Sequence, residues 1–243
     1  THPDLLDWLA QRFIESGWSV KAMHRLMMLS SAYQMSSADR PECSAVDVAN
    51  DSWWRFNRRR LEAEEVRDSI LAVAGTLDRA PGSDHPFPPE VEWHYTQHKP
   101  FVKDYPTMKR AVYLMQQRIR KQPFLEVFDG ADPNATTAIR PVSQTPIQAL
   151  WMMNSLMAHF QSAKFAERCM AAFSDEPAQI SYASELALGR PAEPEEIQDV
   201  QAYLRSVEAE LTDAEYGRNQ RLDTAFGSFA RVLFSSNEFL FVD

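Results

Sequence analysis

A dense run of arginine and acidic side chains, NRRRLEAEEVRD, occupies residues 57–68. Arginine binds planar anions through two parallel hydrogen bonds, so this run is a candidate site for a phosphate, a sulfate or a sugar acid. The alternative is a structural network of ion pairs, because the run also has the spacing of helical salt bridges. Two attractive pairs and one repulsive pair have the i,i+4 spacing: Arg58–Glu62, Arg60–Glu64 and Glu64–Asp68.

A second candidate for chemistry is the pair His94 and His98, which has the spacing of two metal ligands on one helix face. His85 and Asp104 are the nearest candidates for a third ligand. The surrounding segment is rich in proline, which disfavours the helix that this geometry requires. The sequence therefore predicts solvated loop histidines and no metal centre, with a metal-binding module built on His94 and His98 as an alternative.

Motifs of the common catalytic classes do not occur in the sequence. There is no glycine-rich phosphate loop, no Gly-x-Ser-x-Gly elbow and no Cys-x-x-Cys-His haem attachment site. The aromatic runs Trp53-Trp54 and Trp93-His94-Tyr95 are able to stack on sugar rings, although use in the core or in an interface is the simpler interpretation. Cys43 and Cys169 are the two cysteines, and they do not determine the redox compartment.

The charged run must be positioned by a helix, and its periodicity predicts one long helix from Trp53 to Leu77. On such a helix the apolar residues Val66, Ile70 and Val73 share a face with Arg59 and Glu62. Desolvating a charge costs several kcal/mol, so a charge on a buried face requires a partner. We therefore expect Arg59 or Glu62 to be buried and bonded to a residue outside its own helix. The expected partners are Asp129, Arg140, and the segment ending in Asn237 and Glu238.

Helical periodicity recurs along the rest of the chain, and capping residues define several starts. Thr145 is expected to cap a helix that begins at Pro146, with Gln148 completing the capping box. The expected helices, beside the charged one, are Pro3–Ile14, a second from Ser19 to about Tyr33, Pro146 to about Met170, Asp175–Leu188, Glu195–Leu211 and Leu222–Phe234. The expected loops are 36–50, a long Pro/His-rich loop at about 78–106, and 129–140. Residues 110–116 are expected to form a short strand or an extended segment.

These patterns predict a mainly α fold: one multi-helix domain over residues 1–243, with long loops and at most a short strand or hairpin. The formal net charge of −9 argues against nucleic acid as a partner. No apolar run approaches the roughly 18 residues that a membrane span needs. The chain begins with Thr1, so we expect a processed chain or a fragment of a longer polypeptide.

Seven blocks of sequence, in this order, resemble the family known as domain of unknown function 1553. The blocks are THPDLLDWLAQRF, GWSVKAMHRLMMLSSAYQMSS, NRRRLEAEEVRDSILAVAG, RAVYLMQQR, FDGADPNATTAIRPVSQTPIQALWMMN, ELALGRP and SNEFLFVD. The resemblance covers nearly the whole chain. It carries no established reaction. The polar residues that match the family pattern form our candidate polar cluster: Asn57, Arg58, Arg59, Arg60, Glu62, Glu64, Arg67, Asp68, Arg110, Asp129, Arg140, Asn154, Asn237 and Glu238, with Tyr113 and Gln148 in the same motifs.

The resemblance implies the C-terminal part of a large, planctomycete-type, cytochrome-c-like protein that is exported to the periplasm or secreted. It places haem c in upstream modules and no cofactor in this chain. The expected function is a structural or interaction module whose partners are other domains of the same parent polypeptide. The alternative is an enzyme domain that acts on a carbohydrate or another anionic substrate through the polar cluster. A cluster that converges on a cleft favours the enzyme, and a cluster paired beneath the core favours the structural module.

Overall fold

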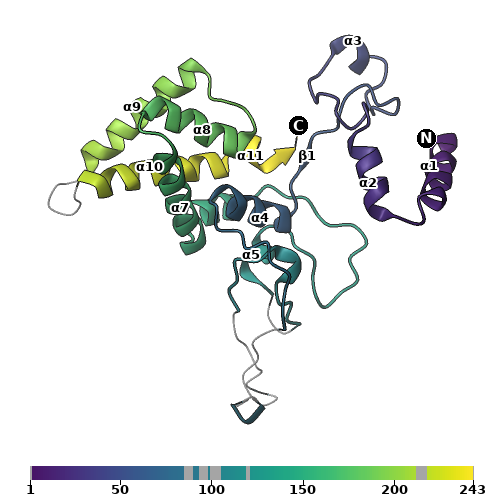
Figure 1. Ribbon diagram of the computed structural model, residues 1–243, viewed down its shortest axis with the longest axis horizontal. Coiled ribbons are helices and arrows are strands. Elements are labelled where there is room, and N and C mark those ends of the chain that lie inside the picture. The colour runs from purple at the N-terminus through teal and green to yellow at the C-terminus, as the bar shows by residue number, and fades with distance from the viewer. Residues whose placement is uncertain are drawn as a thin grey trace. The chain divides into compact units, whose positions relative to one another are not determined.

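A computed structural model describes residues 2–84, 90–92, 98, 105–118, 121–211 and 218–242. The chain is mainly α-helical, as predicted, with eleven α-helices, two 3₁₀ helices and two short strands in these residues (Figure 1). The strands β1 (Arg59–Arg60) and β2 (Phe241–Val242) pair into one small sheet. The chain divides into two compact units, and the expectation of a single domain over residues 1–243 stays a prediction. Unit 1 comprises Thr1–Arg59 and Phe241–Asp243, and unit 2 comprises Arg60–Leu240.

Unit 1 contains three helices: α1 (Pro3–Glu15), α2 (Val20–Met28) and α3 (Pro41–Ser44). Gly17 has φ +68°, a left-handed conformation that ends the first helix, as its sequence predicts. Ser19 then caps α2, since its hydroxyl accepts a hydrogen bond from the Ala22 N–H. Helix α2 ends at Met28, earlier than the predicted Tyr33. The reason is a turn in which the Ser30 hydroxyl accepts from the Tyr33 N–H instead.

The prediction of one long helix from Trp53 to Leu77 is wrong, because the observed helix α4 covers only Ala63–Val73. Trp53 has φ +55°, outside the right-handed helical region. Glu62 is the N-cap, and it forms a capping box with Glu65 that fixes the start of the helix. The left-handed Gly75 follows its end. The helical periodicity of residues 53–62 therefore does not correspond to a helix, because the capping box starts the helix only after Glu62.

Unit 2 contains most of the helices. In chain order they are α4, η1 (Glu90–Glu92), η2 (Ala111–Tyr113), α5 (Pro123–Val127), α6 (Pro146–Asn154), α7 (Leu156–Ala172), α8 (Glu176–Leu188), α9 (Pro194–Glu210), α10 (Arg218–Ser235) and α11 (Asn237–Leu240). The expectation of a short strand or an extended segment at 110–116 is wrong for Ala111–Tyr113, which form the 3₁₀ helix η2, whereas Leu114 after it is extended. Much of the long loop predicted at 78–106 lies outside the described residues.

The capping residues of unit 2 set the helix boundaries. The predicted capping box of Thr145 and Gln148 is confirmed, and α6 begins at Pro146. The single helix predicted to run to Met170 is wrong, because Ser155 is extended, with ψ 144°, and splits it in two. The Ser155 hydroxyl accepts from the Ala158 N–H and thereby caps α7.

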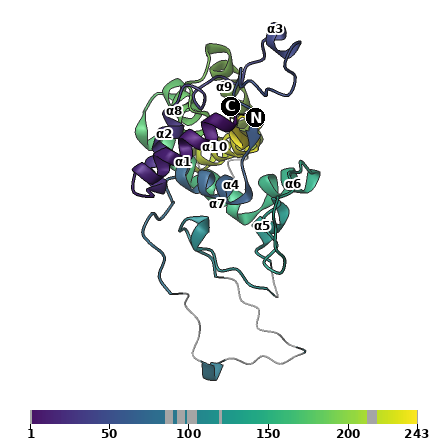
Figure 2. The same cartoon turned by 90° about the vertical axis from the view of Figure 1, so that its right-hand side faces the viewer.

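The core of unit 2 lies where α10 packs on α7, an arrangement visible in both Figure 1 and Figure 2. Phe165 of α7 and Phe234 of α10 are almost fully buried, and their ring centroids are 5.5 Å apart. Phe239 extends this contact at 5.3 Å from Phe234. Val66 and Ile70 are the buried residues of α4 that the periodicity predicts. This helical core supports the polar residues considered next.

Candidate functional site

Arg60 is one of two arginines of the charged run with a buried side chain, which is 6% exposed. Its Nη1 donates to the carbonyl oxygen of Ser143, and its Nη2 donates to Oε1 of Gln148 at 2.9 Å. Oδ2 of the Asp129 carboxylate lies 3.9 Å from Nη1. Burial lowers the pKa of the Arg60 guanidinium, and the charge of Asp129 opposes this shift.

A tight turn after α5 places Asp129 in this network. Asp129 itself has φ +63°, and the Gly130 N–H donates to the Leu125 carbonyl oxygen at 2.6 Å. A Cβ at Gly130 would lie 2.8 Å from that oxygen, so the turn requires glycine. The turn directs the Asp129 carboxylate toward Ser143, whose N–H and hydroxyl both donate to it, at 2.9 and 2.7 Å to Oδ2.

Gln148 connects these groups, and it is only 4% exposed. Its Nε2 donates to the Val127 carbonyl oxygen at 3.0 Å and to Oδ2 of Asp129 at 3.3 Å, while its Oε1 accepts from Arg60. A side-chain amide suits this position because it is both a donor and an acceptor. Arg60, Asp129, Ser143 and Gln148 therefore form one network, which we call the Arg60 network.

A cavity of about 310 Å³ opens beside this network, and we call it the Arg60 cavity. Arg60, Phe128, Thr145, Ala149, Met152 and Asn237 are among its walls. The Nε–H of Arg60 is buried and has no hydrogen-bond acceptor in the part of the chain that the structure describes. The cavity thus combines a buried cation, amide and hydroxyl groups, and an apolar floor.

Arg140 forms a separate network with the start of α4. Its Nη1 lies 2.5 Å from Oε2 of Glu64 and 3.1 Å from Oε2 of Glu62. The hydrogen bond that Arg140 donates to the Glu64 carboxylate raises the pKa of Arg140. Glu62 has a 54% exposed side chain and Arg59 is exposed. The prediction that Arg59 or Glu62 is the buried charge is therefore wrong, because β1 and the N-cap take both residues off the buried helix face.

Arg67 and Asp68 of α4 form a third network with the segment that follows the long loop. Arg67 is 5% exposed; it donates to the carbonyl oxygens of Thr107 and Lys109, the latter at 2.9 Å, and its Nη1 lies 3.0 Å from Oδ1 of Asp68. The Asp68 carboxylate accepts from the Ala111 N–H at 2.8 Å. Burial lowers the pKa of Arg67, and Asp68 opposes this. The network holds the chain around η2 against α4.

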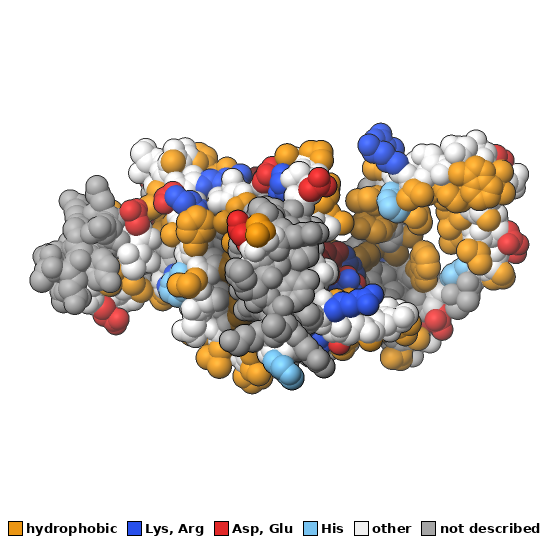
Figure 3. Space-filling model, turned by 90° about the horizontal axis from the view of Figure 1, so that it is seen from below, with side chains coloured by type: hydrophobic (Ala, Val, Ile, Leu, Met, Phe, Trp, Pro, Cys, Tyr) orange, Lys and Arg blue, Asp and Glu red, His pale blue; other side chains and the backbone are white. Residues whose placement is uncertain are grey.

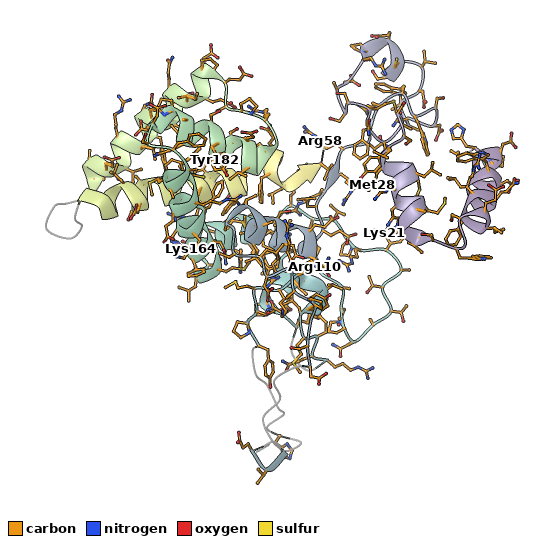
Figure 4. All side chains as sticks on the ribbon, in the orientation of Figure 1. Lys21, Met28, Arg58, Arg110, Lys164 and Tyr182 are labelled. Carbon is orange, nitrogen blue, oxygen red and sulfur yellow. The ribbon has the colours of Figure 1, made fainter. Side chains whose placement is uncertain are left out.

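The remaining members of the candidate polar cluster lie elsewhere. Asn57 belongs to unit 1, where its Oδ1 accepts from Asn50 at 3.1 Å. Asn154 is exposed and bonds to Leu150 of its own helix. Arg110 lies over the Tyr113 ring at 5.6 Å. Arg58 is exposed in unit 1, Asn237 borders the Arg60 cavity, and Glu238 pairs with Arg190. Figure 4 labels Arg58 and Arg110 among the side chains.

The helical ion pairs expected within the charged run are also affected by the later start of α4 at Ala63. Arg58 and Arg60 precede the helix, so Arg58–Glu62 and Arg60–Glu64 do not have helical i,i+4 geometry. Glu64 and Asp68 do lie one turn apart in α4, and each is engaged by a different group, Arg140 and Ala111. The candidate polar cluster therefore separates into distinct networks.

Unit 1 has an apolar groove that the sequence does not predict. Its volume is about 440 Å³, and Leu5, Leu9, Met27, Trp53 and Phe56 are among its walls. Helices α1 and α2 contain no buried residue. Figure 3 shows apolar side chains gathered on the surface of unit 1, at the right of that view. We call this feature the N-terminal groove.

Asn50 holds one wall of the groove in place. It is 5% exposed and adopts φ +59°, a conformation that asparagine tolerates better than most residues. Its Nδ2 donates to the Arg55 carbonyl oxygen at 2.8 Å, and its Oδ1 accepts from the Arg55 N–H at 3.3 Å. The Trp54 indole donates to the Asp47 carbonyl oxygen at 2.9 Å and lies under the Arg55 guanidinium, 4.7 Å away. The wall is thus ordered by its own side chains.

One residue and one groove were missed for different reasons. Ser143 has no local sequence signal, since its role depends on the turn at Asp129. The sequence does not predict the N-terminal groove, because apolar residues at helical spacing, such as Leu5 and Leu9, are also the pattern of a helix that packs on a core.

Among the described residues, no group of three or more His, Cys, Asp or Glu side chains is arranged to hold a metal ion. His94 lies outside the described residues, so the His94–His98 pair is not placed. No described helix has both the length and the apolar composition needed to cross a bilayer.

The fold and these sites define a mainly α-helical protein with a polar cavity in its larger unit and an apolar groove in its smaller one. The chain belongs to the family described as PSD1, "Protein of unknown function (DUF1553)", whose model matches residues 1–204. The resemblance drawn from the seven sequence blocks is confirmed at the level of this family. No curated protein and no solved structure matches the chain.

Proposed function

We propose that this chain is an interaction module, and that its N-terminal groove binds another domain of the same parent polypeptide. The observation that carries this proposal is the exposure of apolar side chains on α1 and α2. Leu5 is 39% exposed, Met27 is 41% and Met28 is 53%. Monomeric proteins seldom leave such residues exposed in a contiguous patch, and larger patches mark interaction sites.

The form of the groove favours a protein segment as its occupant. Apolar side chains of α1 and of α2 line the groove, and the loop that contains Trp53 and Phe56 lines it as well. An amphipathic helix or an apolar strand end fits such a groove, in which side chains at helical spacing serve as anchors. Trp53 and Tyr33 supply the large aromatic contact surfaces that dominate interface energetics.

We propose further that the parent is an exported, haem-associated, cytochrome-c-like protein, periplasmic or secreted. The family resemblance supports this setting. Any haem c would belong to other modules, since this chain has no Cys-x-x-Cys-His motif. Within such a protein, the module would position its neighbours and carry out no chemistry itself.

Oxidative footprinting tests the proposal. The chain alone and the longer polypeptide encoded by its gene are exposed to the same brief dose of oxidant, and methionine oxidation is measured by mass spectrometry. Met27 lines the groove, whereas Met153 of α6 is 59% exposed in unit 2 and serves as the internal control. We expect Met27 to be protected at least about fivefold in the longer polypeptide, while Met153 changes little. Equal reactivity of Met27 in both would contradict the proposal.

A matched pair of variants separates the groove from general surface hydrophobicity. Leu5 lines the groove, and the adjacent Leu6, 69% exposed, does not. We expect Leu5→Glu to restore the reactivity of Met27 in the longer polypeptide and Leu6→Glu to leave it protected. A second copy of the chain is the competing occupant. Sedimentation that shows a dimer of the chain alone, lost in Leu5→Glu, would replace the proposal by self-association.

A further inference from the structure

We propose that the Arg60 cavity is a binding site for the carboxylate of a small organic acid. The proposal concerns unit 2 and is independent of the function proposed for the N-terminal groove. It rests on a buried cation with incomplete pairing, on the groups that line the cavity, and on the size and apolar floor of the cavity.

The Arg60 side chain is a buried cation whose charge is only partly compensated by the described residues. The Asp129 carboxylate forms an ion pair with it at 3.9 Å, which is beyond hydrogen-bonding distance. That carboxylate already accepts hydrogen bonds from Ser143 and Gln148. The Nε–H of Arg60 has no acceptor in the described part of the chain. A buried charged donor without an acceptor is costly, and a ligand oxygen in the adjoining cavity would supply one.

The lining of the cavity favours an anion over a cation. Its polar walls are amide and hydroxyl groups, including those of Gln144, Thr145, Ser235 and Asn237, and its described walls include no carboxylate. Within the described residues, the side chains of Gln144 and Asn237 make no hydrogen bond to another residue and are exposed. Both are therefore available to a ligand.

The start of α6 adds to the positive potential. Thr145 is the N-cap of this nine-residue helix, Pro146 is its first residue, and both line the cavity. The first turn contains no acidic residue that would neutralise the helix dipole. Anions are stabilised at such a terminus. The dipole and Arg60 act together on the same cavity.

The apolar floor indicates an organic acid and not an inorganic anion. Phe128, Ala149, Met152 and Leu240 line the cavity beside its polar groups. The carboxylate would pair with the planar guanidinium and its hydrocarbon chain would contact these side chains. The volume of about 310 Å³ lies at the lower end of small-molecule sites, which suits a short acid. Inorganic phosphate would leave the apolar floor uncovered.

Ligand titration by NMR tests the proposal with sodium butyrate, its neutral isostere butyramide, and inorganic phosphate, all at one ionic strength. We expect butyrate to bind the intact chain at least about tenfold more tightly than butyramide, the ratio expected for a charge-assisted hydrogen bond. Phosphate should bind more weakly than butyrate. Equal affinity for butyrate and butyramide would overturn the proposal, and tighter binding of phosphate would assign an inorganic oxyanion site instead.

Substitutions at the cavity wall, with one control elsewhere, test whether butyrate binds in the Arg60 cavity. Ala149 is exposed at the cavity wall, so Ala149→Phe fills the cavity without removing a hydrogen bond, whereas Ala202→Phe adds the same ring on the exposed face of α9. We expect Ala149→Phe to weaken butyrate binding at least about tenfold and Ala202→Phe to leave it unchanged. Asn237→Ala should weaken it to a smaller extent. Arg60→Lys, which keeps the charge but not the planar fork, should reduce the preference for butyrate over phosphate. Unchanged butyrate affinity in Ala149→Phe would overturn the proposal, whatever the stability of the Arg60 variant.

Discussion

Arg190 makes two hydrogen bonds to the carboxylate of Glu238, at 2.6 and 2.9 Å, across 48 residues of sequence. The same guanidinium makes two hydrogen bonds to Glu196, at 2.8 and 2.9 Å. Glu196 is also the third residue of α9, where it accepts from the Glu193 N–H in a capping box. One arginine therefore joins the start of α9 to the short helix α11.

This arrangement predicts a pH-dependent contribution to stability. The hydrogen bond from Arg190, and then that from Glu193, lowers the pKa of Glu196 from 4.5 to about 2. The folded state thus favours the ionised carboxylate, so its contribution is fully present above about pH 4.5 and is lost as the pH falls toward 2. The Glu196 side chain is 44% exposed, which screens the charge. We expect Glu196→Gln to lower the free energy of unfolding by about 1 kcal/mol at pH 7.

Urea unfolding at pH 7, 4.5 and 3 measures this effect. The difference between the wild type and Glu196→Gln should shrink as the pH falls. Glu195→Gln, one residue earlier in the same helix turn, is the matched control and should stay within about 0.5 kcal/mol of the wild type. A difference that is constant across the pH range would show that the capping geometry, and not the charge, is responsible.

The buried Arg67 predicts a larger loss. Arg67→Met removes the donors to the carbonyl oxygens of Thr107 and Lys109 and leaves both part-buried groups without this partner. We expect the free energy of unfolding to fall by about 3 kcal/mol, in the range for breaking a buried charged network. Guanidinium unfolding measures it, with the exposed Arg205→Met of α9 as the control. A loss below about 1 kcal/mol would mean that the segment detaches from α4 at little cost.

Arg59 is exposed and Arg67 is buried, and this difference shows which features of the fold the sequence alone predicts. Periodicity placed Val66 and Ile70 correctly in the core, because that pattern depends only on the helix that contains them. It failed at Arg59, since β1 and the Glu62 cap change the register before the helix begins. Capping signals were the more reliable guide: Ser19 and Thr145 begin helices as predicted, each through a bond to a nearby N–H.

The candidate site was less predictable because its contacts are remote in sequence. Arg60 meets Ser143 and Gln148 across 83 and 88 residues. The family pattern named Arg60, Asp129 and Gln148, but it gave no means to separate them from Arg110 or Asn154, which lie elsewhere. The geometry that does so is the left-handed turn at Asp129 and Gly130, and only the tertiary structure shows that it faces Arg60.

Thiol reactivity offers a further prediction. Cys169 is buried in α7, and burial raises the pKa of its thiol to about 12. The thiolate is the reactive species, so at pH 8 about one molecule in ten thousand carries it. Cys43 is half-buried in α3. A chromogenic disulfide reagent should therefore titrate one thiol in the native protein and two in guanidinium. Rapid native titration of two thiols in the wild type, and of one thiol in Cys43→Ser, would show that α7 opens readily.

The last prediction concerns Gln148, because the Arg60 network depends on its two-sided hydrogen bonding. Gln148→Met preserves the length of the side chain and removes its polar atoms. Arg60 then loses the acceptor at 2.9 Å, and the Val127 carbonyl oxygen loses the donor at 3.0 Å. Both groups lie in a part-buried setting where lost partners are not fully replaced by water. We expect the free energy of unfolding to fall by about 3 kcal/mol. Gln144→Met, exposed and four residues earlier, should change it by less than about 0.5 kcal/mol.

A double-mutant cycle with Arg60→Met tests whether the two residues act as one network. If they do, the double variant should be more stable than the sum of the single losses predicts, by about 1–3 kcal/mol, because the second substitution removes a group that the first left without a partner. Gln144→Met combined with Arg60→Met should be additive. Additivity in the Gln148 cycle would mean that Gln148 serves only α6 and the Asp129 turn, and that Arg60 is held by Ser143 alone.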